Sequence, residues 1–363
     1  MSAPEWREPQ RRCLRLEDWP AADRESWQEA VGAGRLLADD GPGAALRPVT
    51  LKRHRASYGR WLGFLTRQGW LDPAEEPGMR ATAERIRGYV GELQELNAPG
   101  TVLVRLQSLA VVLGWLAPDL DWSWLRPIIQ RLAARVRPCR AKDSRLRGSE
   151  ELIALGHRLM AQAEQGSAPE DGGRRYPVEV KRAMRYRDGL MVALLAHHPL
   201  RLANLAGLQL GHELRDDGSG WWLELEPAAI KNRRPYLVPL ARDLIPPLDR
   251  YLRYWRPRLA GPAAAAQPDA LWLSGEGGAL GTNHVRHRIC RHTEIAFGKP
   301  VNPHLFRDAM ATTIAVRRPE LVGIVTPLLG HRSVVTAQRH YNRAGMTSAA
   351  DKWHDVLDRL SRE

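Results

Sequence analysis

Residues 302–315 of the chain read NPHLFRDAMATTIA and combine a helix-start signal with two basic side chains. Asn302 and Pro303 are residue types that favour the first positions of a helix. His304 and Arg307 follow at a spacing of three, so a helix that begins here places both side chains on one face, beside the positive end of the helix dipole. Such a corner suits a phosphate. The segment therefore predicts a helix with an anion site at its start.

A second segment lies closer to the end of the chain. Residues 328–343, LLGHRSVVTAQRHYNR, contain His331 and, ten positions later, Tyr341. A tyrosine hydroxyl can attack phosphorus if neighbouring cations lower the cost of forming the phenolate. The sequence has no carboxylate cluster that suggests a Mg²⁺ site, so a metal-activated water is not the expected nucleophile. Tyr341 is therefore either an ordinary half-buried aromatic or the attacking group.

Two further cations lie in suggestive surroundings. Arg201, in HHPLRLANLAGLQL, follows a long apolar helix and precedes several leucines, where a charge requires an anion or a carboxylate partner. Lys231, in AAIKNRRPYLVPL, lies between two predicted strands, where its side chain can extend from the turn. Taken alone, the arginine suggests a structural ion pair and the lysine a solvated surface. Together with His304 and Arg307 they form a set suited to phosphoryl transfer, in which cations neutralise the non-bridging oxygens and an acid protonates the leaving oxygen.

The order of these residues resembles that of the tyrosine recombinases, also called phage integrases. The resemblance covers residues 148–347, and PHLFRDAMATT and LLGHRSVVTAQRHY are similar to two signature segments of that family. It implies that Tyr341 attacks the DNA, forms a 3′-phosphotyrosyl bond and releases a 5′ hydroxyl. It also implies that Arg201 and Arg307 clamp the phosphate, that Lys231 is the general acid, that His304 assists proton transfer, and that His331 stabilises the transition state. Neither a metal nor another cofactor is implied.

The resemblance also implies partners. Members of the family act on double-stranded DNA with inverted-repeat core sites, as four identical protomers on two synapsed duplexes, and an accessory directionality factor is a further expected partner. The job of such enzymes is DNA integration, excision or resolution, often for a mobile genetic element. Residues 348–363 are expected to form a C-terminal helix that docks onto a neighbouring protomer.

Three positions depart from the family pattern. The position three after Arg201 is usually acidic and is Asn204 here, and the residue after Arg307 is often histidine and is Asp308 here. Tyr341 follows His331 by ten positions where nine is commoner, with His340 directly before it. None of these changes removes a catalytic group.

Apolar periodicity predicts a mainly α-helical chain. Four segments repeat apolar residues at i, i+3, i+4 and i+7: Tyr58 to Leu65, Ile86 to Leu93, Val102 to Leu113, and Leu125 to Val136. WWLELE at 221–226 and PYLVPL at 235–240 predict a hairpin, and ALWLS at 270–274 a third strand. Helices are also predicted at residues 179–198, 241–258, 282–297, 304–317, 319–329 and 334–340. We therefore expect an N-terminal extension (1–47), a helical core-binding, SAM-like domain (48–137), a basic linker (138–147), a mixed α+β catalytic domain (148–347) and the C-terminal helix.

Charge favours nucleic acid as the partner, over a merely basic surface or an anionic membrane. The formal net charge is +13, the sequence pI is about 10.2, and all but six of the 54 basic residues are arginine, whose planar fork suits phosphates. DNA contacts are expected at the first core-binding helix, in the linker and in HVRHRICRH (284–292), with solvated faces as the alternative. The candidates are Lys52, Arg53, Arg55, Arg60, Arg140, Lys142, Arg286 and Arg288.

Histidines and a cysteine in residues 284–292 also suggest a metal site, and the cysteine content bears on the compartment. The spacing of His284, His287, Cys290 and His292 could suit a metal, but the interleaved arginines favour a DNA-facing helix, and we expect no metal site. Three scattered cysteines imply no disulfide framework, no signal peptide is evident, and no uninterrupted apolar run approaches roughly 18 residues. A cytoplasmic recombinase is therefore expected. The alternatives are a non-catalytic DNA-binding protein of the same fold and a type IB-like topoisomerase.

Overall fold

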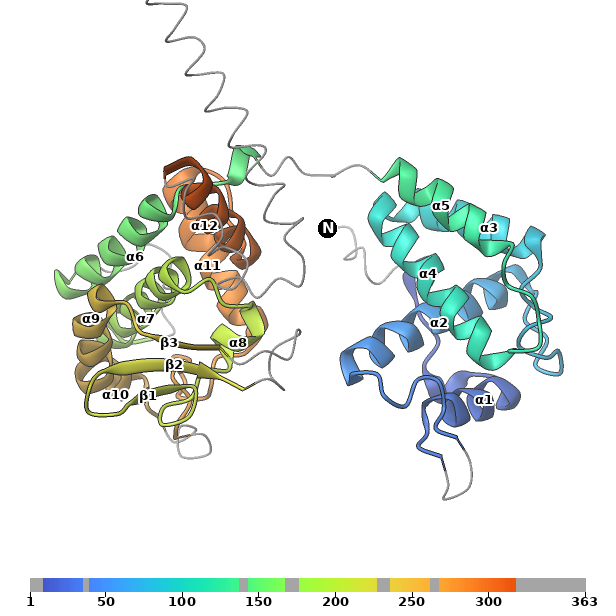
Figure 1. The fold of residues 1–363 in the computed structure, drawn as a ribbon, viewed down its shortest axis with the longest axis horizontal. Coiled ribbons are helices and arrows are strands. Elements are labelled where there is room, and N and C mark those ends of the chain that lie inside the picture. The colour runs from blue at the N-terminus through green and yellow to red at the C-terminus, as the bar shows by residue number, and fades with distance from the viewer. Residues whose placement is uncertain are drawn as a thin grey trace, which may run out of the picture. The chain divides into compact units, whose positions relative to one another are not determined.

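The structure is a computed structural model of the 363-residue chain, and it describes residues 9–34, 39–136, 143–166, 176–226, 236–261 and 268–317. The chain divides into two compact units, Met1–Arg140 (unit 1) and Ala141–Glu363 (unit 2). The boundary falls inside the segment predicted as a basic linker. The described residues are mainly helical with one small sheet, which confirms the predicted fold class (Figure 1).

Unit 1 contains the four predicted helices: α2 (Pro48–Gln68), α3 (Ala83–Leu96), α4 (Pro99–Leu116) and α5 (Leu125–Arg135). Local signals fix their ends. Pro48 and Pro99 stand at first helical positions, the Thr82 hydroxyl accepts a hydrogen bond from the Arg85 N–H (3.3 Å), and Gly69 ends α2 with a φ of 70°. The apolar faces meet in one core, which contains Trp61, Leu65, Ile86, Tyr89, Leu109 and Leu113.

Helix α4 is the central helix of this core. Among the described helices it alone is long and apolar enough, by length and composition, to cross a membrane. Its side chains at Leu106, Leu109 and Leu113 are fully buried, and it packs against α1, α2, α3 and α5. Its apolar character therefore has an explanation within the packing of unit 1.

The N-terminal segment, predicted as an extension, contributes to the same core. Two 3-10 turns, η2 (Pro9–Arg11) and η3 (Leu16–Asp18), precede helix α1 (Ala21–Val31), and the tryptophans Trp19 and Trp27 are buried against Tyr58 and Trp115. The sequence did not predict this packing because the segment is short and lacks a repeating apolar face. Its anchors are two large aromatic side chains and one buried carboxylate.

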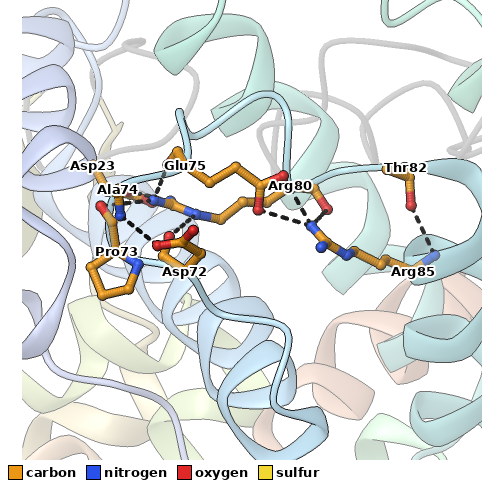
Figure 2. A network of polar contacts seen from close by, with 8 residues as sticks. All are labelled: Asp23, Asp72, Pro73, Ala74, Glu75, Arg80, Thr82 and Arg85. Atoms are coloured by element: carbon orange, nitrogen blue, oxygen red, sulfur yellow. Dashed lines mark hydrogen bonds and ion pairs between the residues drawn. The ribbon is translucent and has the colours of Figure 1, made fainter.

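That carboxylate, Asp23, joins α1 to the loop between α2 and α3 (Figure 2). Asp23 and Arg80 are fully buried and their charged groups approach to 2.5 Å, while the Tyr58 hydroxyl donates a second hydrogen bond to Asp23 (2.6 Å). Arg80 also donates to the carbonyl oxygens of Asp72 (3.1 Å), Pro73 (3.5 Å) and Glu75. One arginine thus satisfies several buried acceptors and fixes the loop against α1.

Unit 2 is built around helices α6 (Ser149–Glu164) and α7 (Val178–His197), which pack closely side by side. Gly156 and Gly189 allow this approach, because a Cβ on Gly156 would lie 2.7 Å from the Gly189 carbonyl oxygen. The helical period of residues 179–198 predicted α7. Helix α6 was missed, although Leu152, Leu155 and Leu159 carry the same helical spacing.

The sheet contains three antiparallel strands in the order β1 (Leu214–Asp216), β2 (Trp221–Leu225) and β3 (Tyr236–Pro239). The predicted hairpin of β2 and β3 is confirmed, with Leu223 opposite Val238. The third strand predicted at residues 270–274 is wrong, because these residues make only isolated bridges and β1 is the third strand. Leu271, Trp272 and Leu273 are all buried, and a continuous apolar run does not distinguish a strand from another buried segment.

The remaining elements complete unit 2. They are η4 (Asp143–Arg145), α8 (Leu202–Ala206), η5 (Arg242–Leu244), α9 (Ile245–Arg250), a π-helical turn η6 (Tyr251–Trp255), α10 (Arg256–Leu259), α11 (Thr282–Phe297) and α12 (Pro303–Arg317). The helical prediction for residues 282–297 agrees with α11. In Figure 1 the sheet lies at one edge of unit 2, and α6 and α12 lie toward the other. The helices expected at residues 319–329, 334–340 and 348–363 lie outside the described residues.

Candidate functional site

The start of α12 presents the predicted pair of basic side chains. The Asn302 side-chain oxygen accepts hydrogen bonds from the backbone N–H groups of His304 (3.0 Å) and Leu305 (3.3 Å), as expected of an N-cap residue, and Pro303 is the first helical residue. His304 is exposed, whereas Arg307, one turn later, is only 6% exposed. The capped helix therefore holds the His304 side chain at the surface and buries the Arg307 side chain.

Arg307 connects α12 to the segment before Arg201. Its guanidinium donates a hydrogen bond to the Pro199 carbonyl oxygen, two residues before Arg201. Burial and the nearby charge of Arg201 lower the pKa of Arg307 to about 10, and Tyr236 and Asp308 oppose this shift. Arg307 remains a cation near neutral pH, in surroundings where an anion would be strongly attracted.

Arg201 is half-buried at the N-cap of α8, and the preceding turn is rigidly held. Nε2 of His198 accepts a hydrogen bond from the Ala241 N–H (3.1 Å), and the His198 carbonyl oxygen accepts one from the Leu200 N–H (2.6 Å). Burial, aided by His197, lowers the pKa of His198 to about 4. His198 is therefore neutral near pH 7, which leaves Nε2 able to accept.

These side chains line one cavity of about 210 Å³. Its walls are Leu200, Arg201, Leu202, Arg286, Asn302, Pro303, His304 and Arg307. The structure thus brings together three of the predicted catalytic residues, Arg201, His304 and Arg307, from segments about a hundred positions apart. Among the described residues that line this cavity, every charged side chain is an arginine, which suits a phosphodiester that gains negative charge in its transition state.

Five predicted site residues lie outside the described residues: Lys231, His331, Tyr341, Arg140 and Lys142. Strand β3 begins at Tyr236, shortly after Lys231 in the sequence. Burial raises the pKa of Tyr236 to about 12, against an opposing influence of the Arg307 charge. The first residue of β3 therefore lies within electrostatic range of the cavity wall.

Helix α11, which supplies Arg286, is fixed to α7 by a buried cluster around Asp188. The Asp188 carboxylate binds Arg187 (2.6 Å), Arg288 (2.6 Å) and His292 (2.9 Å). Burial opposes the charge of Asp188, but these three partners hold its pKa well below the usual range. Arg288, predicted as a DNA contact, thus has a structural role in binding Asp188, and its side chain is only 20% exposed.

The histidine and cysteine side chains of α11 do not converge on one point, as the ligands of a metal ion must. His292 is bonded to Asp188, while His284 and His287 are exposed. The described part of the chain contains no group of three or more His, Cys, Asp or Glu side chains able to hold a metal ion.

In unit 1, Lys52, Arg53 and Arg55 are exposed on the first turns of α2, as a DNA contact would require. The same expectation for Arg60 is wrong, because Arg60 is 3% exposed and pairs with Glu92 at 3.2 Å. A cavity of about 320 Å³ is lined by Arg53, Ala56, Ser57, Gly100, Thr101, Val104 and Arg105. Sequence reasoning missed Arg105, whose only signal is its place near the start of α4.

Comparisons with known proteins indicate the family of the chain. A model of the phage integrase family matches residues 178–347. The tyrosine recombinase XerC of Myxococcus xanthus is 31% identical over 264 residues, which cover 72% of this chain and 78% of that protein. XerC of Pseudomonas fluorescens is 25% identical over 289 residues, 72% of this chain and 92% of that protein.

A solved structure, that of XerA recombinase, covers 86% of this chain and 94% of its own, with 19% identity and a TM-score of 0.38. The assignment rests instead on the family model and on the XerC relatives, whose matches extend over both units. The matched segment 178–347 contains all six residues of the predicted catalytic set. The chain belongs to the phage integrase family, the family of the tyrosine recombinases.

Proposed function

We propose that this tyrosine recombinase cuts and rejoins DNA at specific sites through a covalent bond between Tyr341 and a 3′ phosphate. The Tyr341 oxygen attacks phosphorus and its proton passes to His304. The bond from phosphorus to the 5′ oxygen breaks, and Lys231 protonates that oxygen. Arg201, Arg307 and His331 hold the non-bridging oxygens and stabilise the transition state. Because the covalent phosphotyrosine keeps the energy of the broken phosphodiester bond, no metal or other cofactor is needed.

The observation that carries this proposal is the cavity shared by Arg201, His304 and Arg307. Arg307 is buried and hydrogen-bonded to the turn before Arg201, so the fold orients the Arg307 guanidinium and holds the backbone that carries Arg201 before any DNA arrives. Preorganised cations stabilise a transition state better than flexible ones, because no reorganisation is needed during the reaction. The capped N-terminus of α12 adds its dipole to the same place.

The substrate follows from this chemistry and from the family. We propose double-stranded DNA with inverted-repeat core sites, bound by unit 2 at the cleaved phosphate and by exposed basic residues of unit 1. Four protomers would assemble on two duplexes in the cytoplasm, with an accessory factor setting direction. Integration of a mobile element, excision and dimer resolution all use these same steps.

The test is a strand-exchange assay with two differently labelled duplexes taken from the protein's own genomic neighbourhood. Recombinant joints made by the wild type and lost in Arg201→Ala support the proposal, because they require cleavage and religation at two paired sites. Relaxation of supercoiled plasmid without joints would instead indicate a topoisomerase. Specific binding without any cut strand would indicate a DNA-binding protein that retains the fold.

A further inference from the structure

A third arginine, Arg286, lines the phosphate cavity and comes from a separate element, α11. The side chains of Arg201 and Arg307 reach the cavity from α8 and α12. Arg286 is exposed, in contrast to the buried Arg307. A charged side chain from a third direction, at a cavity that already holds two arginines, requires an explanation because like charges repel.

The backbone of Arg286 is held in a fixed place relative to α12. Val285 and Ile289 are fully buried on the inner face of α11, and Arg288 binds Asp188 of α7 at 2.6 Å. The Thr293 hydroxyl accepts a hydrogen bond from the Val301 N–H (2.9 Å), which fixes the turn that leads into α12. Arg286 therefore belongs to the same rigid frame as His304 and Arg307.

The guanidinium of Arg286 is available to a ligand. Among the residues that the structure describes, it makes no hydrogen bond or ion pair, whereas Arg288, two positions on, is bound to Asp188. The charge of Arg286 also acts on the thiol of Cys290. Burial raises the pKa of that thiol, and the charge of Arg286 opposes this shift. The five N–H donors of Arg286 thus stand at the cavity with no carboxylate partner in the described part of the chain.

Charge provides the reason for this arrangement. A phosphodiester carries one negative charge, and attack by an oxygen nucleophile adds a second as the pentacovalent transition state forms. A cation placed where this charge develops lowers the barrier more than it strengthens ground-state binding.

We propose that Arg286 is a further phosphate-binding residue of the cleavage site and contacts a non-bridging oxygen of the scissile phosphodiester. The inference rests on the proposed function, since it presumes that this cavity receives the scissile phosphate. It assigns Arg286 a role in the reaction, in contrast to Arg288, which serves the fold.

The test removes the proposed contact in two ways, by changing Arg286 in the protein and by changing the scissile phosphate in the DNA. The full-length protein and its Arg286→Ala variant are compared on DNA with a normal scissile phosphate and on DNA whose scissile phosphate is a neutral methylphosphonate. Cleavage rates and, in a Tyr341→Phe background, Kd values are measured. We expect Arg286→Ala to slow cleavage of normal DNA by about 100-fold, the usual scale for one lost transition-state donor, and to slow cleavage of the methylphosphonate by less than about 5-fold.

Lys299→Ala is the matched control, because Lys299 is an exposed cation of unit 2 that does not line the cavity. It should change both substrates by the same small factor. Arg286→Lys, with thermal melting of each variant, separates loss of charge from loss of folding. The proposal is overturned if Arg286→Ala slows cleavage of both substrates by the same factor. It is also overturned if the defect disappears only when the methylphosphonate replaces a phosphate next to the scissile one. If the wild type forms no adduct with any DNA, the proposed function itself fails. If the wild type forms adducts and Arg286→Ala cleaves normal DNA at the wild-type rate, only the inference about Arg286 fails.

Discussion

The guanidinium of Arg307 donates a hydrogen bond to the carbonyl oxygen of Pro199, two residues before Arg201. One arginine of the cavity thus orders the turn that carries the other, and we propose that both bind the scissile phosphate. Because Arg307 is buried and the charge of Arg201 lowers its pKa, the two side chains depend on each other for position and charge. They should act as one unit in the reaction.

The first prediction follows from this dependence. Arg307→Lys keeps a charge but loses the planar fork that serves both Pro199 and a phosphate, so the cleavage rate should fall by about 100- to 1,000-fold. Combining it with Arg201→Ala should cost far less than the product of the single effects. Single-turnover cleavage measures both. Arg317→Lys, at the exposed end of the same helix, is the control. Independent, multiplicative effects would contradict the coupling.

A second prediction concerns acid stability. The pKa of His198 is lowered to about 4 in the folded protein, below the usual value of 6.5, so the unfolded chain binds a proton first as the pH falls. The stabilising effect of a neutral His198 is complete above pH about 6.5 and is lost progressively toward pH about 4, by about 3 kcal/mol in all.

His198→Gln removes this titration and keeps an acceptor for the Ala241 N–H. The acid side of the pH–stability curve should therefore be shallower in His198→Gln than in the wild type. Urea unfolding at several pH values between these limits measures the difference. Parallel curves for the two proteins would show that His198 does not titrate as described.

The third prediction concerns the buried pair of Asp23 and Arg80. Asp23→Asn leaves Arg80 without its charge partner in a fully buried place, and should destabilise unit 1 by about 3–5 kcal/mol. Hydrogen exchange of the α1 amides in the full-length protein should accelerate accordingly. Asp39→Asn, at an exposed carboxylate, is the control. Unchanged protection of α1 would mean that the tryptophans alone hold the segment.

The fourth prediction separates two arginines of α2. Arg53 is exposed and lines a cavity with Arg105, so Arg53→Ala should weaken DNA binding and reduce the slope of log K against log salt by about 1. Arg60 is buried against Glu92, so Arg60→Met should leave that slope unchanged while it alters stability. A smaller slope for Arg60→Met and not for Arg53→Ala would reverse the assignment.

Much of the architecture could be predicted from local signals. Helix-start residues are recognisable in the sequence and stand at the observed helix starts. They are the prolines and the threonine that begin α2, α3 and α4, and the pair Asn302–Pro303 that begins α12. The hairpin was predicted from two short apolar runs. The features that the sequence did not predict depend on long-range contacts. Trp19 and Asp23 are buried by partners 35 or more positions away, which no local period reveals.

The candidate site shows the same division. Residue types and order marked Arg201, His304 and Arg307, and the fold brings them to one cavity. Arg286 and Arg288 look alike in the sequence, both being arginines among histidines on α11. Only the position of Asp188 on a neighbouring helix makes one a structural residue and leaves the other at the cavity.

The most direct test of Tyr341 as the nucleophile is a covalent-trapping measurement. The wild type, Tyr341→Phe and His340→Phe are incubated with DNA from the protein's genomic neighbourhood, denatured with detergent, and the protein-linked DNA ends are sequenced. We expect adducts at one short inverted repeat for the wild type and His340→Phe, joined through a 3′ phosphate, and none for Tyr341→Phe. Adducts that persist in Tyr341→Phe would contradict this assignment.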